Sequence, residues 1–260
     1  MLKALALDAP RECERIVSFI RQEFAKAGFS KGVVGVSGGV DSALVAALAA
    51  RALGASNVYG LILPYRTSNP ESEAHARLVI GLLGLPYERF EITPMVEPLL
   101  QRDSSMNDRR RGNVMARCRM IVLYDQAAAL NSLVLGTSNR TETLLGYFTL
   151  HGDGAADIKP IAHLYKCQVR QLARHVGIPE AIVEKAPSAD LWAGQTDEGE
   201  LGFTYDEADQ ILYCLTEKGL GTAQIASLGF DIKVVEAVKR RMEMTAFKRL
   251  PPPVLPQANC

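Results

Sequence analysis

The hydrophobic positions of the chain change repeatedly between helical and strand spacing. From Cys13 to Phe24 apolar residues recur every three or four positions until Gly28, which predicts an amphipathic helix. Short β-branched runs and further helical segments then alternate. We expect strands over residues 32–36, 58–63, 87–92 and 133–135, and helices over 43–53, 70–83 and 113–130. Because strands that alternate with helices form parallel sheets, this order predicts an α/β fold.

After residue 135 the apolar pattern is helical. Further helices are expected over residues 165–176, 207–217, 222–228 and 232–244. We therefore expect a single domain over residues 1–260, with a helical C-terminal part from about residue 207. Three consecutive prolines in the tail, from Pro251 to Pro253, exclude a helix there and predict a strap on the surface.

Composition excludes several classes of protein. The 260 residues include 29 Lys and Arg and 29 Asp and Glu, a net charge of zero, so we expect neither disorder nor a nucleic-acid partner. The longest apolar runs are shorter than the ~18 residues that a membrane span needs, and the apolar N-terminal stretch is too short for a signal peptide. We expect no membrane partner and a cytoplasmic location. Five dispersed cysteines without a C-x-x-C pair predict buried small side chains.

Charge is distributed unevenly in two segments. Residues 101–120 carry six arginines and two acids, and residues 187–209 carry seven acids and no base. Such runs are typical of solvated faces or mobile loops. We expect residues 188–204 to form a lid that substrate orders, and, on weaker grounds, residues 103–112 to do the same. The alternative is a permanently mobile acidic loop.

The sharpest motif is Ser37-Gly38-Gly39-Val40-Asp41-Ser42, where the first expected strand leads into a helix. Adjacent glycines let a backbone approach a ligand, and hydroxyls together with the free N–H groups of a helix start can bind phosphate oxygens. The chain lacks the G-x-x-x-x-G-K-[ST] pattern of γ-phosphate transfer. The carboxylate of Asp41 instead suggests a metal ion. The alternative is a glycine turn capped by serine.

This motif resembles the S-G-G-x-D-S signature of ATP pyrophosphatases, which cleave ATP between its α and β phosphates. Within that group the chain resembles NAD synthetases, in order from about residue 33 to 209. The supporting segments are G-N-V-x-A-R-x-R-M at 112–120, G-T at 136–137 with Glu142, G-D-G-A-A-D-I-x-P at 152–160, L-x-K-x-Q-V at 164–169, P-S-A-D-L at 187–191 and E-L-G-x-x-Y-D-E at 200–207. The resemblance implies an adenine nucleotide alpha hydrolase-like fold. Such a fold is a doubly wound parallel sheet of about five strands in the order 3-2-1-4-5, with helices on both faces.

The resemblance also implies a reaction, in which ATP, deamido-NAD and ammonia give NAD, AMP and pyrophosphate through an adenylated intermediate. ATP is then a co-substrate, Mg²⁺ a cofactor and a homodimer the active unit. Only about 30 residues precede the first strand, fewer than the roughly 100 of a glutaminase domain, so we expect ammonia rather than glutamine as nitrogen donor.

Matching positions carry the family's site residues onto this chain. The implied ATP-binding residues are Val36, Ser37, Gly38, Gly39, Val40, Asp41, Ser42, Arg66, Thr137, Lys166 and Ser188. The implied metal ligands are Asp41 and Glu142, which follow the first and fourth strands, whose ends should meet where doubly wound sheets bind ligands. The implied deamido-NAD-binding residues are Arg117, Tyr124, Tyr147, Asp153 and Asp157. Lys166, which reaches the phosphates, and Asp153, which orients ammonia, are the implied catalytic residues.

Each assignment has a simpler alternative. Glu142 could be a carboxylate at a helix start, Lys166 a solvated helix lysine, and the tyrosines core residues. Two departures from the family, Leu150 for a common lysine and Phe247 for a common histidine, remove polar groups near the dinucleotide site. Two rival functions stay open. One is an adenylating amide or sulfur transferase acting on another carboxylate or on tRNA, and the other is a nucleotide-binding regulatory module without turnover.

Overall fold

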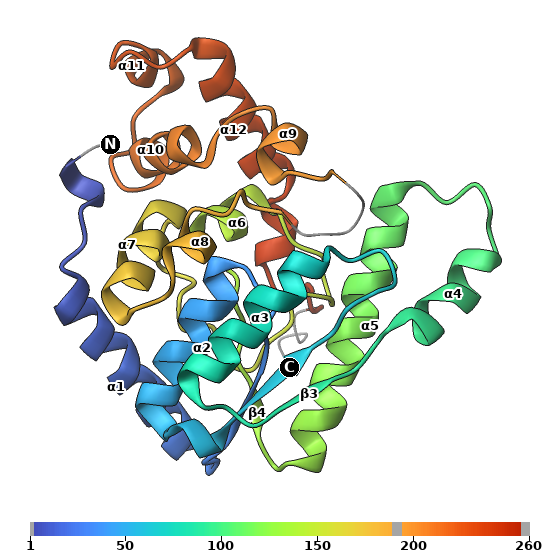
Figure 1. Ribbon diagram of the computed structural model, residues 1–260. Helices are drawn as coiled ribbons and strands as arrows, with labels where there is room; N and C mark the ends of the chain where they lie inside the picture. The colour runs from blue at the N-terminus through green and yellow to red at the C-terminus, as the bar shows by residue number, and fades with distance from the viewer. Residues whose placement is uncertain (1–2, 189–193, 256–260) are drawn as a thin grey trace, which may run out of the picture.

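A computed structural model describes residues 3–188 and 194–255, and it contains the expected parallel sheet (Figure 1). Its strands are β1 (Gly32–Gly35), β2 (Val58–Ile62), β3 (Tyr87–Arg89) and β4 (Leu133–Val134). They lie in the order β3-β2-β1-β4, and all neighbours are parallel. A single parallel bridge joins Leu135 to Ile158 beyond β4, so the fifth strand of the expected order is reduced to one residue pair in the described chain. The predicted α/β class and the order of the first four strands are confirmed.

Helices cover both faces of the sheet. On one face lie α1 (Ala9–Ala27), α2 (Val40–Leu53), α3 (Pro70–Leu83) and α7 (Lys166–Val176), and on the other lie α4 (Thr93–Gln101) and α5 (Asp108–Ala129) (Figure 1). The remaining α-helices are α6 (Arg140–Leu145), α8 (Glu180–Val183), α9 (Asp197–Leu201), α10 (Tyr205–Thr216), α11 (Thr222–Ala226) and α12 (Ile232–Met244). The 3₁₀ turns are η1 (Lys3–Leu5), η2 (Ala55–Asn57) and η3 (Ala246–Arg249).

Local sequence decides where most helices begin and end. The Asp8 carboxylate accepts the N–H of Arg11 at 3.2 Å to start α1, and Gly28 ends it at φ 77°. Helices α2 and α5 begin several residues before the start that their apolar periodicity predicts. Helix α2 starts at Val40 because Gly39 takes an extended conformation, and α5 starts at Asp108 because the Asn107 side chain accepts the N–H of Arg110 at 3.0 Å. Part of the SGGVDS motif is therefore the first turn of α2.

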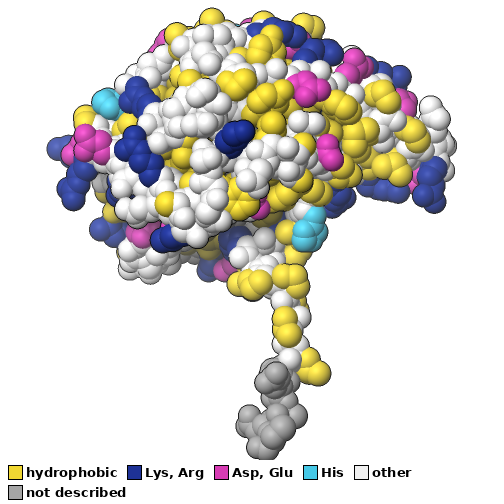
Figure 2. Space-filling model, turned by 90° about the horizontal axis from the view of Figure 1, so that it is seen from below, with side chains coloured by type: hydrophobic (Ala, Val, Ile, Leu, Met, Phe, Trp, Pro, Cys, Tyr) yellow, Lys and Arg dark blue, Asp and Glu magenta, His cyan; other side chains and the backbone are white. Residues whose placement is uncertain are grey.

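The C-terminal helices form a second layer on α6 and α7. Helix α10 packs on both of them, α12 packs on α6, and together they enclose a separate apolar cluster at the top of Figure 1. The chain end does not form the expected strap within the described residues. Val254 and Leu255 are 85% and 90% exposed, and the tail leaves the body (Figure 2). Across residues 3–188 and 194–255, no helix combines the length and apolarity of a transmembrane segment.

The acidic segment is only in part the solvated face that its charge predicts, because Glu200 and Asp206 are exposed but two other acids are not. Asp197 and Asp209 are buried, at 5% and 0% exposure, because hydroxyl and N–H donors surround them. Residues 197–201 form α9, and Phe203 is buried beside it. Residues 197–201 and Phe203 are therefore not part of a permanently mobile loop. Residues 189–193 of the expected lid lie outside the described chain, and lid movement stays a prediction.

Candidate active site

A cavity of about 1750 Å³ opens at the carboxyl ends of the strands. Its size exceeds the roughly 300–1,000 Å³ of a site for one small ligand. The predicted site residues that line it are Val36, Ser37, Gly39, Val40, Asp41, Ser42, Arg66, Arg117, Thr137, Glu142, Tyr147, Asp153, Lys166 and Ser188. The fold therefore brings residues from six separate chain segments to one space.

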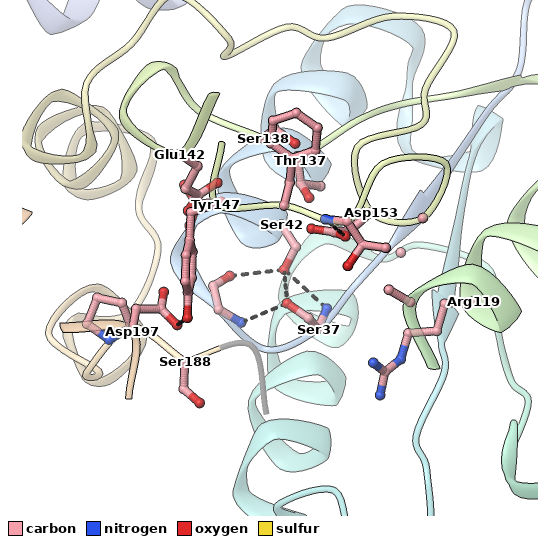
Figure 3. Close-up of a pocket in the computed structure, with 18 of the residues that line it drawn as sticks. Ser37, Ser42, Arg119, Thr137, Ser138, Glu142, Tyr147, Asp153, Ser188 and Asp197 are labelled. Carbon is pink, nitrogen blue, oxygen red and sulfur yellow. Dashed lines mark hydrogen bonds between the residues drawn. The ribbon is translucent and has the colours of Figure 1, made fainter. Parts of the chain in front are cut away.

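Ser37 and Ser42 close the glycine turn at the centre of this cavity (Figure 3). Their hydroxyl oxygens are 3.1 Å apart, and the Ser42 hydroxyl donates to the Gly39 carbonyl at 3.0 Å. Gly38 has φ +82°, and a Cβ there would lie 2.1 Å from the Ser72 carbonyl oxygen. In the described chain no side chain caps the α2 N-terminus, so its N–H groups remain available for an anion.

The Lys166 ammonium lies between two carboxylates at one wall of the cavity. Its Nζ atom is 2.5 Å from Asp41 Oδ2 and 3.2 Å from Glu142 Oε1. The lysine is only 3% exposed, so the alternative of a solvated helix lysine is wrong. Burial alone lowers the pKa of Lys166, but the two carboxylates outweigh it and raise the pKa above its ordinary value. A positive charge is therefore held beside the glycine turn.

Asn139 joins the two carboxylates into one cluster. Its side-chain amide donates to Asp41 Oδ1 at 2.8 Å, and its backbone N–H donates to the Glu142 carboxylate at 3.3 Å. Its side-chain oxygen in turn accepts the Glu142 N–H at 2.9 Å. Glu142 is thus both a helix-start carboxylate and a partner of Lys166, so its two interpretations are compatible. Sequence reasoning did not single out Asn139, although Asn139-x-x-Glu142 has the spacing of a capping box.

The two carboxylates fit a magnesium ion better than a transition metal. Both point at one cation, the Lys166 ammonium, and burial raises the pKa of Glu142 while Lys166 opposes that rise. Across residues 3–188 and 194–255 there is no cluster of three or more His, Cys, Asp or Glu side chains with metal-binding geometry. Mg²⁺ accepts one or two carboxylates and takes its other ligands from phosphates and water, whereas zinc sites need three or four protein ligands.

Two tyrosines and Asp197 lie on the side of Lys166 that faces α9 and α10. The Lys166 ammonium lies 5.0 Å from the centre of the Tyr205 ring, whose hydroxyl donates to Asp197 at 3.0 Å. Tyr147 donates to Asp197 at 3.2 Å and to Glu200 at 2.8 Å. Figure 3 shows Tyr147 and Asp197 on the same side of the cavity as Glu142. Tyr205 and Asp197 are functional neighbours that sequence reasoning missed, because the acidic run suggested solvent rather than burial.

Comparison with known proteins places this chain in a family. Residues 12–252 match the NAD synthase family. The chain belongs to the NAD synthase family. It is 52% identical to the NH(3)-dependent NAD(+) synthetase of Trichlorobacter lovleyi over 234 residues, which cover 90% of this chain and 86% of that protein.

Solved structures of NAD synthase relatives have the same fold. The NMN synthetase of Francisella tularensis superposes with a TM-score of 0.86 at 33% identity, covering 97% of this chain and 100% of its own. The NH3-dependent NAD synthetase of Campylobacter jejuni has a TM-score of 0.82 at 32% identity, covering 96% and 100%. The two relatives are named for different products, so the second substrate needs its own test.

The part of the NAD synthase cavity away from the glycine turn is rich in cations. Lys248 donates from Nζ to the carbonyls of Gly146 at 2.8 Å and Phe148 at 2.6 Å. Burial and the charge of Arg109 lower the pKa of Lys248, and burial and Arg109 also lower that of Arg241. Because these cations repel one another, binding of an anion among them is favourable. Leu150 and Phe247, the two departures named above, line the same cavity, and other cations such as Arg117 and Arg240 line it as well.

Asp153 lies in this second part of the cavity and is held by the backbone. Its Oδ1 atom accepts the N–H of Thr149 at 2.8 Å. The Arg117 guanidinium donates to the carbonyl of Leu150 at 3.3 Å. Asp153 therefore lies in the loop formed by residues 149–153, and Arg117 is hydrogen-bonded to the same loop.

Tyr124 and Asp157 are placed differently from the other predicted residues. Asp157 accepts the N–H of Val134 in β4 at 2.7 Å, and it contacts the Tyr124 hydroxyl. Neither belongs to the described lining of the cavity, and among the predicted residues Gly38 is also absent from it, although its neighbours Ser37 and Gly39 line it. Burial, followed by the charge of Asp157, raises the pKa of Tyr124, so its phenol stays protonated at neutral pH. These two residues therefore lie beside β4 rather than at the glycine turn.

Proposed function

We propose that this chain catalyses the ATP-dependent amidation of deamido-NAD to NAD with ammonia, releasing AMP and pyrophosphate. The observation that carries the proposal is the Lys166 ammonium, held by Asp41 and Glu142 beside the glycine turn. A cavity large enough for two nucleotides surrounds these groups. The 52% identical relative is named for ammonia-dependent NAD synthesis, which supports the same chemistry here.

In the first step the substrate carboxylate attacks the α-phosphorus of ATP, and pyrophosphate leaves. Both reactants are anions, so cations and oriented N–H groups must offset their repulsion. The hydroxyls of Ser37 and Ser42 and the free N–H groups of α2 bind the phosphates, and Lys166 supplies a positive charge beside them. This arrangement favours attack on the α-phosphorus because the loop lacks the lysine of a γ-phosphate site.

In the second step ammonia attacks the carbonyl carbon of the adenylate, and AMP leaves. Asp153, fixed by the Thr149 N–H, orients the ammonia and accepts a proton as the amide forms. Arg117 and Lys248 bind the anionic groups of the dinucleotide. An acyl adenylate hydrolyses readily, so exclusion of water by the deep cavity favours ammonia as the nucleophile.

Mg²⁺ is the metal that the carboxylate pair fits. Asp41 and Glu142 would hold it, and the ion would neutralise charge on the triphosphate when bound. With its carboxylate partners engaged by the ion, the Lys166 ammonium would be available to the phosphate oxygens.

The homodimer is a further part of the proposal. Helix α5 exposes Ile121 by 51%, and Leu99 in α4 and Phe90 after β3 are 43% and 38% exposed. Figure 2 shows hydrophobic side chains gathered on the right, the side on which Figure 1 places α4 and α5. A second copy covering this patch would bury it. We also propose the cytoplasm, where ATP and NAD precursors are available, as the place of action.

The deciding experiment is an assay of the purified chain with ATP, Mg²⁺ and deamido-NAD, with and without ammonium. We expect ammonium-dependent formation of NAD with equal amounts of AMP and pyrophosphate. Stoichiometric ADP would contradict the mechanism. Parallel reactions with the acid form of NMN in place of deamido-NAD, and with glutamine in place of ammonium, test the substrate and the nitrogen donor. Preferred use of the mononucleotide would show the activity for which the Francisella relative is named.

A further inference from the structure

A fully buried carboxylate lies behind the active-site lysine and does not face the cavity. Asp209, in the middle of α10, has 0% exposure. Its Oδ2 atom accepts the backbone N–H of Cys167 at 2.7 Å, and its Oδ1 atom accepts the hydroxyl of Thr141 at 2.5 Å. Burial raises the pKa of Asp209, while these donors oppose the rise. A buried carboxylate is costly, so its position needs a physical reason.

Thr141 connects this carboxylate to the lysine itself. The Thr141 oxygen accepts the backbone N–H of Lys166 at 3.0 Å while its hydrogen is donated to Asp209. Thr141 is also 0% exposed and belongs to the first turn of α6, next to Glu142. The chain of bonds therefore ties the start of α6 to the start of α7.

The Asp209 carboxylate lies at the N-terminus of α7. The first N–H groups of a helix have no acceptor within the helix, and this end of the helix carries a partial positive charge. The side chain of the α7 N-cap residue, Tyr165, makes no capping bond in the described chain, so a residue from α10 takes that task. Because Lys166 is the first residue of α7, the carboxylate that fixes this turn also fixes the origin of the lysine side chain.

Helix α10 supports the lysine at two levels. Tyr205 and Asp209 are four residues apart, so they lie on the same face of α10. Tyr205 lies against the ammonium at 5.0 Å, and Asp209 holds the backbone end. A long flexible side chain is thus constrained at both ends by one helix from the C-terminal layer.

We propose that Asp209, acting through Thr141 and the first turn of α7, is a positioning residue that holds Lys166 in place for the ATP phosphates. The proposal rests on the proposed function only in naming ATP as the ligand. Asp209 touches neither substrate nor reacting atoms, and its effect reaches the reaction through Lys166. Loss of this support frees the lysine to move, and a displacement of about 1 Å at such a group can lower activity on the order of 100-fold.

The first test is a matched pair of substitutions at Thr141. Thr141→Val keeps the volume and removes the hydroxyl, whereas Thr141→Ser keeps the hydroxyl and removes a methyl group. We expect Thr141→Val to weaken ATP binding about tenfold, because it leaves a buried N–H and a buried carboxylate without their partner. Thr141→Ser should stay within about threefold of wild type. Equilibrium dialysis with labelled ATP and Mg²⁺ measures this dissociation constant without turnover.

The second test asks whether Asp209 acts through Lys166. Asp209→Asn retains the size but leaves one acceptor oxygen for two donors, so ATP binding should again weaken about tenfold. In a Lys166→Met background the same substitution should change binding less than twofold, because the group that it positions is gone. Asp206→Asn, on the same helix with a 65% exposed carboxylate, is the control and should bind ATP as wild type does.

The outcomes separate this proposal from the proposed function. If Asp209→Asn lowers ATP affinity equally in the wild-type and Lys166→Met backgrounds, the positioning role is overturned. It is also overturned if Thr141→Val and Thr141→Ser bind ATP with the same affinity. A folded Thr141→Val protein with a lowered melting temperature but wild-type ATP binding would assign the network to stability alone and overturn the proposal. If wild type makes no NAD while these binding effects appear, the function fails and the positioning role stands.

Discussion

The two sides of the proposed phosphate site are built in opposite ways. The glycine turn uses six consecutive residues, and its hydrogen bonds join Ser37, Gly39 and Ser42 to one another. On the lysine side, Lys166 meets Asp41 across 125 residues of sequence and Glu142 across 24. The first side depends on backbone conformation and the second on tertiary packing. Substitutions on the two sides should therefore differ in their effects on stability and on activity.

The largest expected effect is loss of the lysine charge. Lys166→Met keeps most of the side-chain length but removes the ammonium that faces Asp41 and Glu142. We expect NAD formation to fall on the order of 1,000-fold, as when a preorganised donor is removed from a transition state. Steady-state rates at saturating ATP and ammonium measure the loss.

Lys218→Met is the matched control for this variant. Lys218 is exposed and follows α10, away from the cavity lining. Its rate should stay within about twofold of wild type. A Lys166→Met protein with near wild-type turnover would contradict the role of the buried ammonium.

Breaking the glycine turn should act on folding as well as on activity. Gly38→Ala places a Cβ at φ +82° and 2.1 Å from the Ser72 carbonyl. The left-handed conformation alone costs about 1–2 kcal/mol, and the clash adds to it. We expect the melting temperature to fall by about 4 °C or more, measured by differential scanning calorimetry.

The neighbouring glycine provides the comparison. A Cβ on Gly39 would meet Ser37 Oγ at 3.5 Å, an ordinary contact, and Gly39 has a negative φ. Gly39→Ala should therefore change the melting temperature by less than about 2 °C. Equal destabilisation by the two alanines would show that the turn does not depend on the conformation of Gly38.

A smaller effect is expected from the aromatic support of the lysine. Tyr205→Phe keeps the ring 5.0 Å from the ammonium but removes the bond to Asp197, which should cost about 1 kcal/mol of stability. Tyr205→Leu also removes the ring, so we expect a further loss of about threefold in ATP affinity. Identical ATP affinities for the Phe and Leu variants would refute a contribution of the ring.

The smallest expected effect is a change in pH dependence at Asp197. Burial raises the pKa of Asp197, although Lys166 and two tyrosines oppose the rise. The folded state therefore binds this proton more readily than the unfolded state, and the contribution of Asp197 to stability falls as pH increases through its raised pKa. Asn does not titrate. The stability of Asp197→Asn relative to wild type should improve between pH 4 and pH 7 in urea unfolding, and parallel curves would contradict this.

Sequence alone predicted most of the sheet and the motif-bearing turn. Apolar periodicity placed all four strands, and Gly28 marked the end of the first helix. Short helices such as α6 and α9 were missed, because five or six residues carry too little periodicity to be recognised. The proline-containing α4 was missed because Pro98 normally interrupts a helix.

The sequence by itself determined those features in which the interacting residues are close together in the chain. The turn from Ser37 to Ser42 and the capping pair Asn139 and Glu142 can be recognised in the printed residues, since backbone geometry links them directly. Only the tertiary structure decided that Asp209 is buried behind Lys166 rather than solvated within an acidic run. The reason is physical. A charged segment is expected to be exposed to solvent unless other elements of the fold supply hydrogen-bond donors that make burial of its carboxylates favourable.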